Sequence, residues 1–275
     1  MKAALVQMRV DSNKLKNLQI ASDSISQAAE QGADMVVLPE MFCCPYHTSN
    51  FPIYAEKEGG PHWQMMSDAA KQNHVYLVAG SMPEKDDNGL IYNTSYAFDR
   101  EGKQIAKHRK MHLFDIDVKG GQSFKESDTL TAGNQVTVFD TEFCKMGLAI
   151  CYDFRFPELS RLMVERGAKV IIVPAAFNMT TGPAHWDILF RTRALDNQVY
   201  TIGTSPARDE RACYVSYANS IVVSPWGDVT MKMDEKEGIK YCELDLERVE
   251  SVRKQLPLLA HRRRDVYTLR ENRCD

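Results

Sequence analysis

The N-terminal part of the chain alternates between apolar runs and an amphipathic segment. Residues 2–8 and 35–38 are apolar runs of strand length, and residues 14–31 carry leucine, isoleucine and alanine at broadly helical spacing. Gly32 follows this segment, as expected at the end of a helix. The order strand, helix, strand predicts two parallel strands joined by a right-handed crossover.

The same patterns recur along the rest of the chain. Further segments have the apolar spacing of helices, at residues 62–73, 157–166, 184–197 and 246–255. Short apolar or alternating runs predict strands at residues 75–80, 92–98, 104–107, 136–139, 145–151, 169–174, 200–205, 220–223 and 240–244. Turn signals make the middle of the chain antiparallel, and a turn at residues 225–228 joins the last two strands. This order predicts an α/β fold in which two sheets pack between helix layers.

Two segments show no regular period. Residues 43–60 are rich in proline, tyrosine and phenylalanine, which predicts a loop with room for one helical turn, and a loop with glycine and serine follows Asp115. No internal repeat or low-complexity linker divides the chain, so we expect one domain over residues 1–275. Residues 257–275 form its C-terminal extension, which we expect either as a solvated arm or as a segment that packs on a dimer partner.

Composition and charge narrow the class of function. Of the 275 residues, 44% are hydrophobic, and 34 Lys and Arg against 37 Asp and Glu leave a net charge of -3. This balance does not favour nucleic-acid binding, so we expect a small-molecule substrate. We expect no signal peptide and no membrane contact, because no apolar run reaches membrane length. The seven cysteines are an odd number without metal-type CxxC pairs, which predicts free thiols and a cytoplasmic protein.

Two polar residues follow buried strands in this pattern. Cys151 comes directly after the apolar residues 146–150 and before Pro157, which is typical of the first turn of a helix. Glu40 follows the apolar run 35–38 in the same way. Ligands of open α/β sheets bind at the carboxyl ends of the strands, so both side chains are candidates for an active site. By local sequence alone, Cys151 is equally consistent with an inert core cysteine.

A nucleophilic thiol needs a base for its proton and a cation for the oxyanion that its attack creates. Glu40 is the candidate base and Lys110 the candidate cation. Taken singly, Glu40 could be a structural carboxylate and Lys110 a solvated lysine, but their combination with Cys151 favours catalysis. His108 and His112 would suggest zinc if they lay on a helix. Their segment is predicted as strand and loop and lacks the acidic residue of an HExxH motif, so we expect no metal site.

Three ordered motifs carry a resemblance to a known family. Leu38-Pro-Glu40, Lys110-Met-His-Leu-Phe114 and Ile150-Cys151-Tyr-Asp-Phe-Arg155 resemble the Glu-Lys-Cys signature of the nitrilase, or carbon–nitrogen hydrolase, superfamily. The resemblance covers essentially the whole chain. It implies a four-layer αββα sandwich that pairs with a second subunit, often as a homodimer, and a mechanism without a cofactor.

The resemblance also implies a role for each matching residue. Glu40 is the general base, Cys151 is the nucleophile, and Lys110 donates to the oxyanion together with the backbone N–H of Tyr152. Glu126 matches the second glutamate of the family, which orients the lysine and the substrate amide. From its loop position alone, Glu126 could equally be a solvated acid.

Within the superfamily, further motifs resemble the omega-amidases, which hydrolyse the amide of alpha-ketoglutaramate and alpha-ketosuccinamate. These motifs lie at residues 112–118, 124–127, 177–186, 196–199 and 205–209. The resemblance implies hydrolysis of the terminal amide of such dicarboxylate monoamides through a cysteine thioester. Cys43-Cys44 depart from the pattern in the loop where the substrate pocket of such enzymes begins, which leaves the preferred substrate open.

A dicarboxylate monoamide also carries a distal carboxylate, which needs a cation and hydroxyl donors in its binding site. Arg155 is the candidate cation. Tyr46, Thr180 and Thr181 are the candidate donors. Alternatively, Arg155 has a structural role and ties the helix that follows it to Glu158 or another acid.

Three rival functions stay open at this point. The first is another amidase of the superfamily, acting on deaminated glutathione or on N-carbamoyl compounds. The second is a non-catalytic interaction protein that has kept the scaffold, against which the intact Glu40, Lys110 and Cys151 argue. The third is a thiol redox or metal protein, which the absence of CxxC pairs disfavours.

Overall fold

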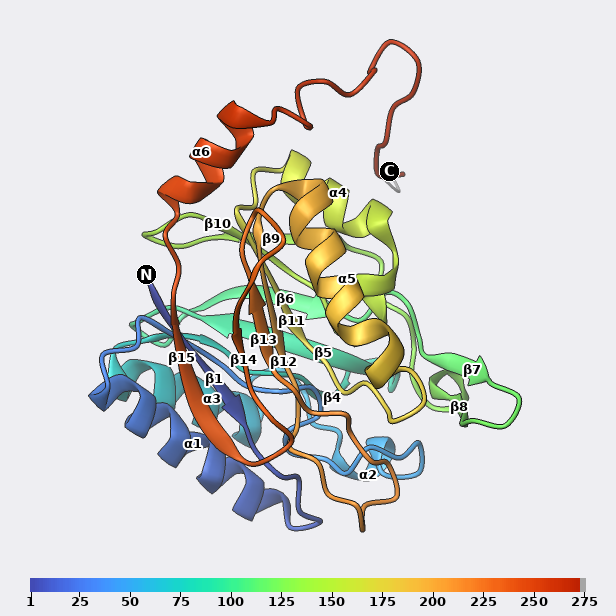
Figure 1. Cartoon of the computed structure of the whole chain (residues 1–275). Coiled ribbons are helices and arrows are strands. Elements are labelled where there is room, and N and C mark those ends of the chain that lie inside the picture. Colours follow the sequence, from blue (N-terminus) through green and yellow to red (C-terminus); the bar gives the residue numbers. More distant parts are fainter. Residues whose placement is uncertain (273–275) are drawn as a thin grey trace.

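The computed structural model describes residues 1–272 and folds them into two sheets between helices (Figure 1). The first sheet has seven strands, in the spatial order β15 (Gly238–Glu243), β1 (Lys2–Gln7), β2 (Met35–Val37), β3 (Tyr76–Val78), β5 (Ile91–Phe98) and β4 (Met82–Lys85), with β6 (Gln104–Arg109) also pairing with β5. The second has six, in the order β14 (Val229–Lys232), β13 (Ile221–Val223), β12 (Tyr200–Thr204), β11 (Val170–Pro174), β10 (Lys145–Leu148) and β9 (Thr137–Asp140).

Helices cover the outer face of each sheet. Helices α1 (Lys14–Glu30) and α3 (Pro61–Asn73) lie against the first sheet, and α4 (Pro157–Glu165) and α5 (Gly182–Asn197) against the second. The predicted αββα sandwich is therefore confirmed. The short helix α2 (Phe51–Tyr54), the hairpin of β7 (Asp115–Asp117) and β8 (Ser123–Lys125), and helix α6 (Glu247–Gln255) lie outside these layers.

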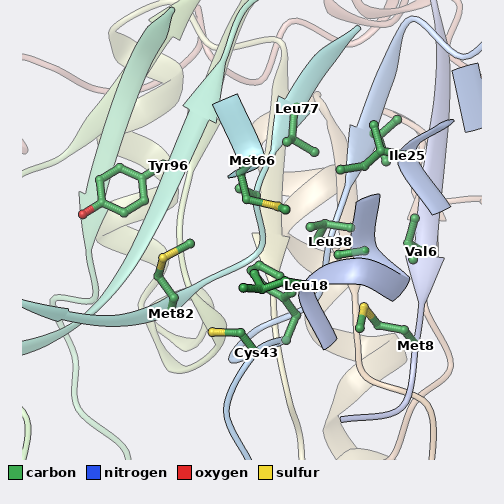
Figure 2. Packing of buried hydrophobic residues seen from close by; sticks show 14 of the residues in the cluster. Val6, Met8, Leu18, Ile25, Leu38, Cys43, Met66, Leu77, Met82 and Tyr96 are labelled. Atoms are coloured by element: carbon green, nitrogen blue, oxygen red, sulfur yellow. The ribbon is translucent and has the colours of Figure 1, made fainter. Parts of the chain in front are cut away.

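Alternating side chains on the central strands fill the three interfaces between the four layers. On β1, Ala4 and Val6 face the helices α1 and α3, whereas Ala3 and Leu5 face the second sheet. Successive side chains of a strand point to opposite faces, so strands that are apolar at every position are buried on both sides. Figure 2 shows the first interface, which includes Leu18, Ile25, Leu38, Met66 and Leu77.

Parallel pairing brings the ends of several strands to one edge. β1, β2 and β3 run parallel to one another, as do β10, β11 and β12. The predicted antiparallel middle is confirmed, because β5 pairs antiparallel with β3, β4 and β6. Residues that follow the parallel strands therefore emerge together at the carboxyl edge of the sheets.

The predicted connection between the last two strands, 220–223 and 240–244, is wrong. The turn at residues 225–228 joins β13 to the additional strand β14, whose residues are mostly exposed and give no apolar run. The predicted strand 240–244 is β15, which begins at Gly238 and pairs antiparallel with β1 of the other sheet. Strand β4 and the β7–β8 hairpin also lack a strand pattern, because β4 contains Pro and Glu and the hairpin is largely exposed. β14 and the hairpin strands are exposed, and β4 is buried but contains polar residues and Pro, so none of these strands leaves an apolar pattern in the sequence.

Residues after α6 run along the end of α4. Arg262 pairs with Glu165, and Arg166 pairs with Glu271. Residues 273–275, the last of the predicted C-terminal extension, lie outside the described residues. The packing of this extension on a second subunit stays a prediction.

Gly80 brings the loop after β3 against the loop that carries Glu40. Its φ is +53°, and a Cβ at this position would lie 2.1 Å from the carbonyl oxygen of Pro39. The substitution Gly80→Ala therefore forces a left-handed backbone on alanine and displaces the residue before Glu40. We expect the free energy of unfolding, measured by urea denaturation, to fall by about 3 kcal/mol or more.

Gly32→Ala is the matched control for this substitution. Gly32 also has a positive φ, +75°, but nothing lies within 4 Å of a Cβ built on it. We expect its loss to be limited to the backbone cost of about 1 kcal/mol. Equal losses in the two variants would contradict the close approach at Gly80.

Candidate active site

Side chains from distant parts of the sequence meet in one buried cluster at the carboxyl edge. Glu40 follows β2, Lys110 follows β6 directly, and Cys151 follows β10 at the start of the short 3-10 helix η2 (Cys151–Arg155). The Nζ atom of Lys110 lies 3.0 Å from Oε1 of Glu40 and 2.9 Å from Oε1 of Glu126. The side chains of Glu40, Lys110 and Glu126 are fully buried, and Cys151 is 5% exposed. The structure thus brings together the four residues that the motifs single out.

Both carboxylate oxygens of Glu40 accept hydrogen bonds. Oε1 accepts from Asn93 Nδ2 at 2.9 Å and from Lys110 Nζ, and Oε2 accepts from the backbone N–H of Ala176 at 2.7 Å. Burial raises the pKa of Glu40, and the charge of Glu126 raises it further, although Lys110 opposes both. A carboxylate whose pKa is raised is suited to take up a proton and return it.

Glu126 and Lys110 form the second half of the cluster. Oε1 of Glu126 accepts from Lys110 Nζ and from the hydroxyl of Tyr46, and Oε2 accepts from the backbone N–H of Phe114 at 2.7 Å. Burial alone would lower the pKa of Lys110, but the carboxylates of Glu126 and Glu40 outweigh burial and raise it. Lys110 is therefore a buried ammonium group between two acids.

Cys151 has a strained backbone and a neutral thiol. Its φ is +45°, in the left-handed region that residues with a Cβ rarely adopt. Burial, followed by the charge of Glu40, raises the pKa of the thiol well above its ordinary value, while Lys110 opposes them. The Glu40 carboxylate and the thiol lie close enough that each acts on the pKa of the other. The proton that must leave the sulfur thus has an acceptor in place.

Sequence reasoning missed Asp153, which lies two residues after Cys151. Its carboxylate is 2.9 Å from His108 Nε2 and 2.8 Å from His112 Nδ1. Burial would raise the pKa of Asp153, but the hydrogen bonds from the two histidines outweigh burial and lower it. The histidine pair that raised the question of zinc thus faces a shared carboxylate. Over residues 1–272, no group of three or more His, Cys, Asp or Glu side chains is arranged to hold a metal ion.

Arg155 lies near the nucleophile without a carboxylate partner among the described residues. Its guanidinium carbon is 4.6 Å from the ring centre of Phe177 and 5.6 Å from that of Tyr152, and Nη1 donates to His185 Nδ1 at 3.0 Å. Burial lowers the pKa of Arg155, while the thiol of Cys151 acts in the opposite direction. The alternative ion pair with Glu158 does not form in the described part of the chain.

The three candidate hydroxyl donors lie in different surroundings. The Tyr46 hydroxyl is inside the buried cluster, where it donates to Glu126 and lies 3.1 Å from Glu40 Oε1 and 3.3 Å from Lys110 Nζ. Because a phenol has a single proton, this donor is already used. Near the start of α5, Thr181 donates to Asn178 at 2.9 Å, and Thr180 is exposed. Tyr46 and Thr181 therefore both have hydroxyl partners within the protein, whereas Thr180 is open to solvent.

Aromatic side chains enclose the cluster. The ring of Tyr214 lies 4.5 Å from that of Tyr46, and its hydroxyl donates to the carbonyl of Ala176. A small cavity beside Glu40 is lined by Tyr46, Tyr214 and Cys44 among others. Sequence reasoning missed Tyr214 because nothing near it in the chain marks a site. The unusual cysteine pair is buried here, and burial raises the pKa of Cys43 to about 12, so this thiol is unreactive.

Comparison with known proteins finds a matching family profile and similar relatives. The family profile described as carbon-nitrogen hydrolase matches residues 2–254. The chain is 49% identical to Omega-amidase NIT2 of Mus musculus over 266 residues, which are 97% of this chain and 96% of the relative.

Solved structures of similar proteins have the same fold. The crystal structure of Saccharomyces cerevisiae Nit3, a member of branch 10 of the nitrilase superfamily, has a TM-score of 0.88 and 42% identity, with 96% of both chains covered. A mutant of the amidase from Nesterenkonia sp. AN1 has a TM-score of 0.78 and 25% identity over 94% of this chain and 98% of that one. That structure shows the result of Michael addition of acrylamide at the active-site cysteine of the amidase.

The backbone strain at Cys151 can be measured with two variants that both lack sulfur. Glycine adopts a positive φ freely, whereas alanine does not, so Cys151→Gly should be more stable to urea than Cys151→Ala by about 1 kcal/mol. At Cys144, whose φ is not positive, we expect Cys144→Ala to be more stable than Cys144→Gly, because glycine loses more conformational entropy on folding. If Cys151→Ala equals or exceeds Cys151→Gly in stability, the nucleophile is not strained.

Proposed function

Because this chain belongs to the carbon–nitrogen hydrolase family, we propose that it acts as an omega-amidase and cleaves its amide through a thioester on Cys151. The observation that carries the proposal is the buried contact of Lys110 with both Glu40 and Glu126, next to Cys151, whose thiol lies close enough to Glu40 and Lys110 for both charges to act on its pKa. The similarity to mouse omega-amidase over nearly the whole chain supports the same reaction class.

The first step is attack of sulfur on the amide carbon. As the S–C bond forms, the thiol proton passes to Glu40 and the carbonyl electrons move to oxygen. Lys110 and the backbone N–H of Tyr152 donate to this oxyanion. The contact of Lys110 with the Tyr46 hydroxyl is its longest, at 3.3 Å, and is the one that the oxyanion replaces. Glu126 keeps the ammonium group in place during this exchange.

The second half of the reaction returns the proton. Glu40 gives its proton to the amide nitrogen as the C–N bond breaks, and ammonia leaves. Water then loses a proton to Glu40 and attacks the thioester. As the S–C bond breaks, Glu40 gives this proton to the sulfur, which releases the free acid and restores both the thiol and the Glu40 carboxylate. Glu40 thus serves in turn as base, acid, base and acid.

The proposed substrates are dicarboxylate monoamides such as alpha-ketoglutaramate and alpha-ketosuccinamate. Arg155 supports this choice, because it is a half-buried cation near Cys151 without a carboxylate partner among the described residues. The distal carboxylate of the substrate would supply that partner, with Thr180 near the start of α5 as a further donor. The hydroxyl of Thr181, like that of Tyr46, already donates its single proton within the protein. Tyr46 instead holds the Glu126–Lys110 pair.

The association and the location of the protein are proposed as well. Exposed Ile188 and Leu195 on α5 support association of two copies of the chain as a homodimer. None of the described helices is both long and apolar enough to cross a bilayer. We propose a cytoplasmic protein on the cysteine pattern alone. We also propose that residues 1–275 form one catalytic domain.

Replacing the nucleophile should abolish turnover without unfolding the protein. We expect Cys151→Ser and Cys151→Ala to release ammonia from alpha-ketoglutaramate about 1,000-fold more slowly or worse, since neither can form the thioester. Cys144→Ser is the matched control, because Cys144 lies away from the cluster, and it should keep wild-type activity. An active Cys151→Ala variant would exclude the mechanism. Higher kcat/KM on deaminated glutathione or an N-carbamoyl amide would favour the rival amidases.

The role of Arg155 can be separated from the chemistry by comparing two substrates. Arg155→Lys keeps the charge but loses the paired N–H groups that match a carboxylate. We expect KM for alpha-ketoglutaramate to rise about 10-fold, while KM for a neutral linear amide of similar length stays within about 2-fold of wild type. An equal rise for both substrates would mean that Arg155 does not bind the distal carboxylate.

A further inference from the structure

Lys110 and Cys151 must keep a fixed separation although they lie on different sheets. Lys110 follows β6 of the first sheet, and Cys151 follows β10 of the second. The oxyanion forms on the carbon that the sulfur attacks, so a misplacement of about 1 Å between the two groups can cost about 100-fold in rate. Packing of apolar side chains between the sheets does not fix a polar side chain that well.

The carboxylate of Asp153 connects the two segments. On the lysine side, Oδ1 accepts from the backbone N–H of Met111 at 3.1 Å and of His112 at 2.9 Å. On the nucleophile side, Oδ2 accepts from the backbone N–H of Ile150 at 3.1 Å. The residues just after the lysine and just before the cysteine therefore share one buried, ionised side chain.

Two imidazoles complete the hydrogen bonding of this carboxylate. His108 donates through Nε2 and His112 through Nδ1, so five donors surround two oxygens. Both rings are held from their other sides. The His112 ring stacks on Phe156 with 3.8 Å between centroids, and Nδ1 of His108 lies 2.9 Å from Thr137 Oγ1. The group is therefore rigid.

We propose that Asp153, His108 and His112 form a positioning unit that fixes Lys110 relative to Cys151. The proposal rests on the proposed function, in which Lys110 holds the oxyanion that Cys151 creates. None of the three touches the reacting atoms. Each histidine contributes a donor at one ring nitrogen, and proton transfer by an imidazole has no part in the reaction.

Amide side chains test this directly because they place an N–H where one ring nitrogen lies. Asparagine matches Nδ1 and glutamine matches Nε2. His112→Asn and His108→Gln therefore keep the donor to Asp153, whereas His112→Gln and His108→Asn move it. We expect the matched variants, His112→Asn and His108→Gln, to keep kcat within about 5-fold of wild type. In the exchanged variants, His112→Gln and His108→Asn, kcat should fall about 100-fold, with KM little changed. The matched and the exchanged variant of each histidine both lack the imidazole ring, so the loss of ring stacking affects both equally.

Two outcomes overturn the proposal. If matched and exchanged variants have equal kcat at equal folded fraction, the donor position does not matter. If all four variants lose activity alike, the histidines act through the ring itself. Urea denaturation of each variant measures the folded fraction.

The rate at which iodoacetamide alkylates Cys151, followed by mass spectrometry of its peptide, supplies a readout that needs no amidase activity. Lys110 stabilises the thiolate, so a displaced lysine should slow alkylation several-fold in the exchanged variants alone. If a substitution only loosened the fold, the thiol would be more accessible and its alkylation would be faster. That result would also contradict the positioning role. If wild type hydrolyses no amide, the proposed function fails while this comparison still decides the positioning role.

Discussion

The structure depends on one buried group of charges, the ammonium of Lys110 between the carboxylates of Glu40 and Glu126. Removing three charged groups from water costs several kcal/mol for each ion, and their attraction offsets this only when every remaining hydrogen-bonding position is filled. That condition is met here. Asn93 and the backbone N–H of Ala176 donate further hydrogen bonds to Glu40. The Tyr46 hydroxyl and the backbone N–H of Phe114 do the same for Glu126. Without the lysine, two neighbouring carboxylates could not both stay ionised.

The layered fold explains why the cluster can be assembled at all. Glu40 and Lys110 are 70 residues apart and come from the ends of β2 and β6 in the first sheet, whereas Cys151 comes from β10 in the second. The core between the sheets holds the two sheets against each other, because Leu5, Val37 and Leu148 pack in the same cluster. Parallel strands direct the polar residues to one edge, and the apolar residues keep water out.

The sequence predicted the layers and the reacting groups because both leave local signals. A buried strand is apolar at each position, as at residues 170–173, and Cys151 and Glu40 stand out where such runs end. β14 left no signal because it is exposed and exists through pairing with β13. Asp153 and Tyr214 were missed for a different reason. Their contacts join residues more than 35 apart, and a single sequence does not state which distant residues meet.

The two glutamates differ in what they can do because their partners differ. Glu40 lies close enough to the thiol to act on its pKa, whereas Glu126 accepts hydrogen bonds from Lys110, Tyr46 and the backbone of Phe114. In the proposed first step, Glu40 becomes neutral as the oxyanion appears, so one negative charge moves from one side of Lys110 to another. The net charge of the site is the same before and after. A buried site with fixed donors can support such a transfer with little rearrangement, which is the advantage of keeping Glu126 ionised while Glu40 changes its charge.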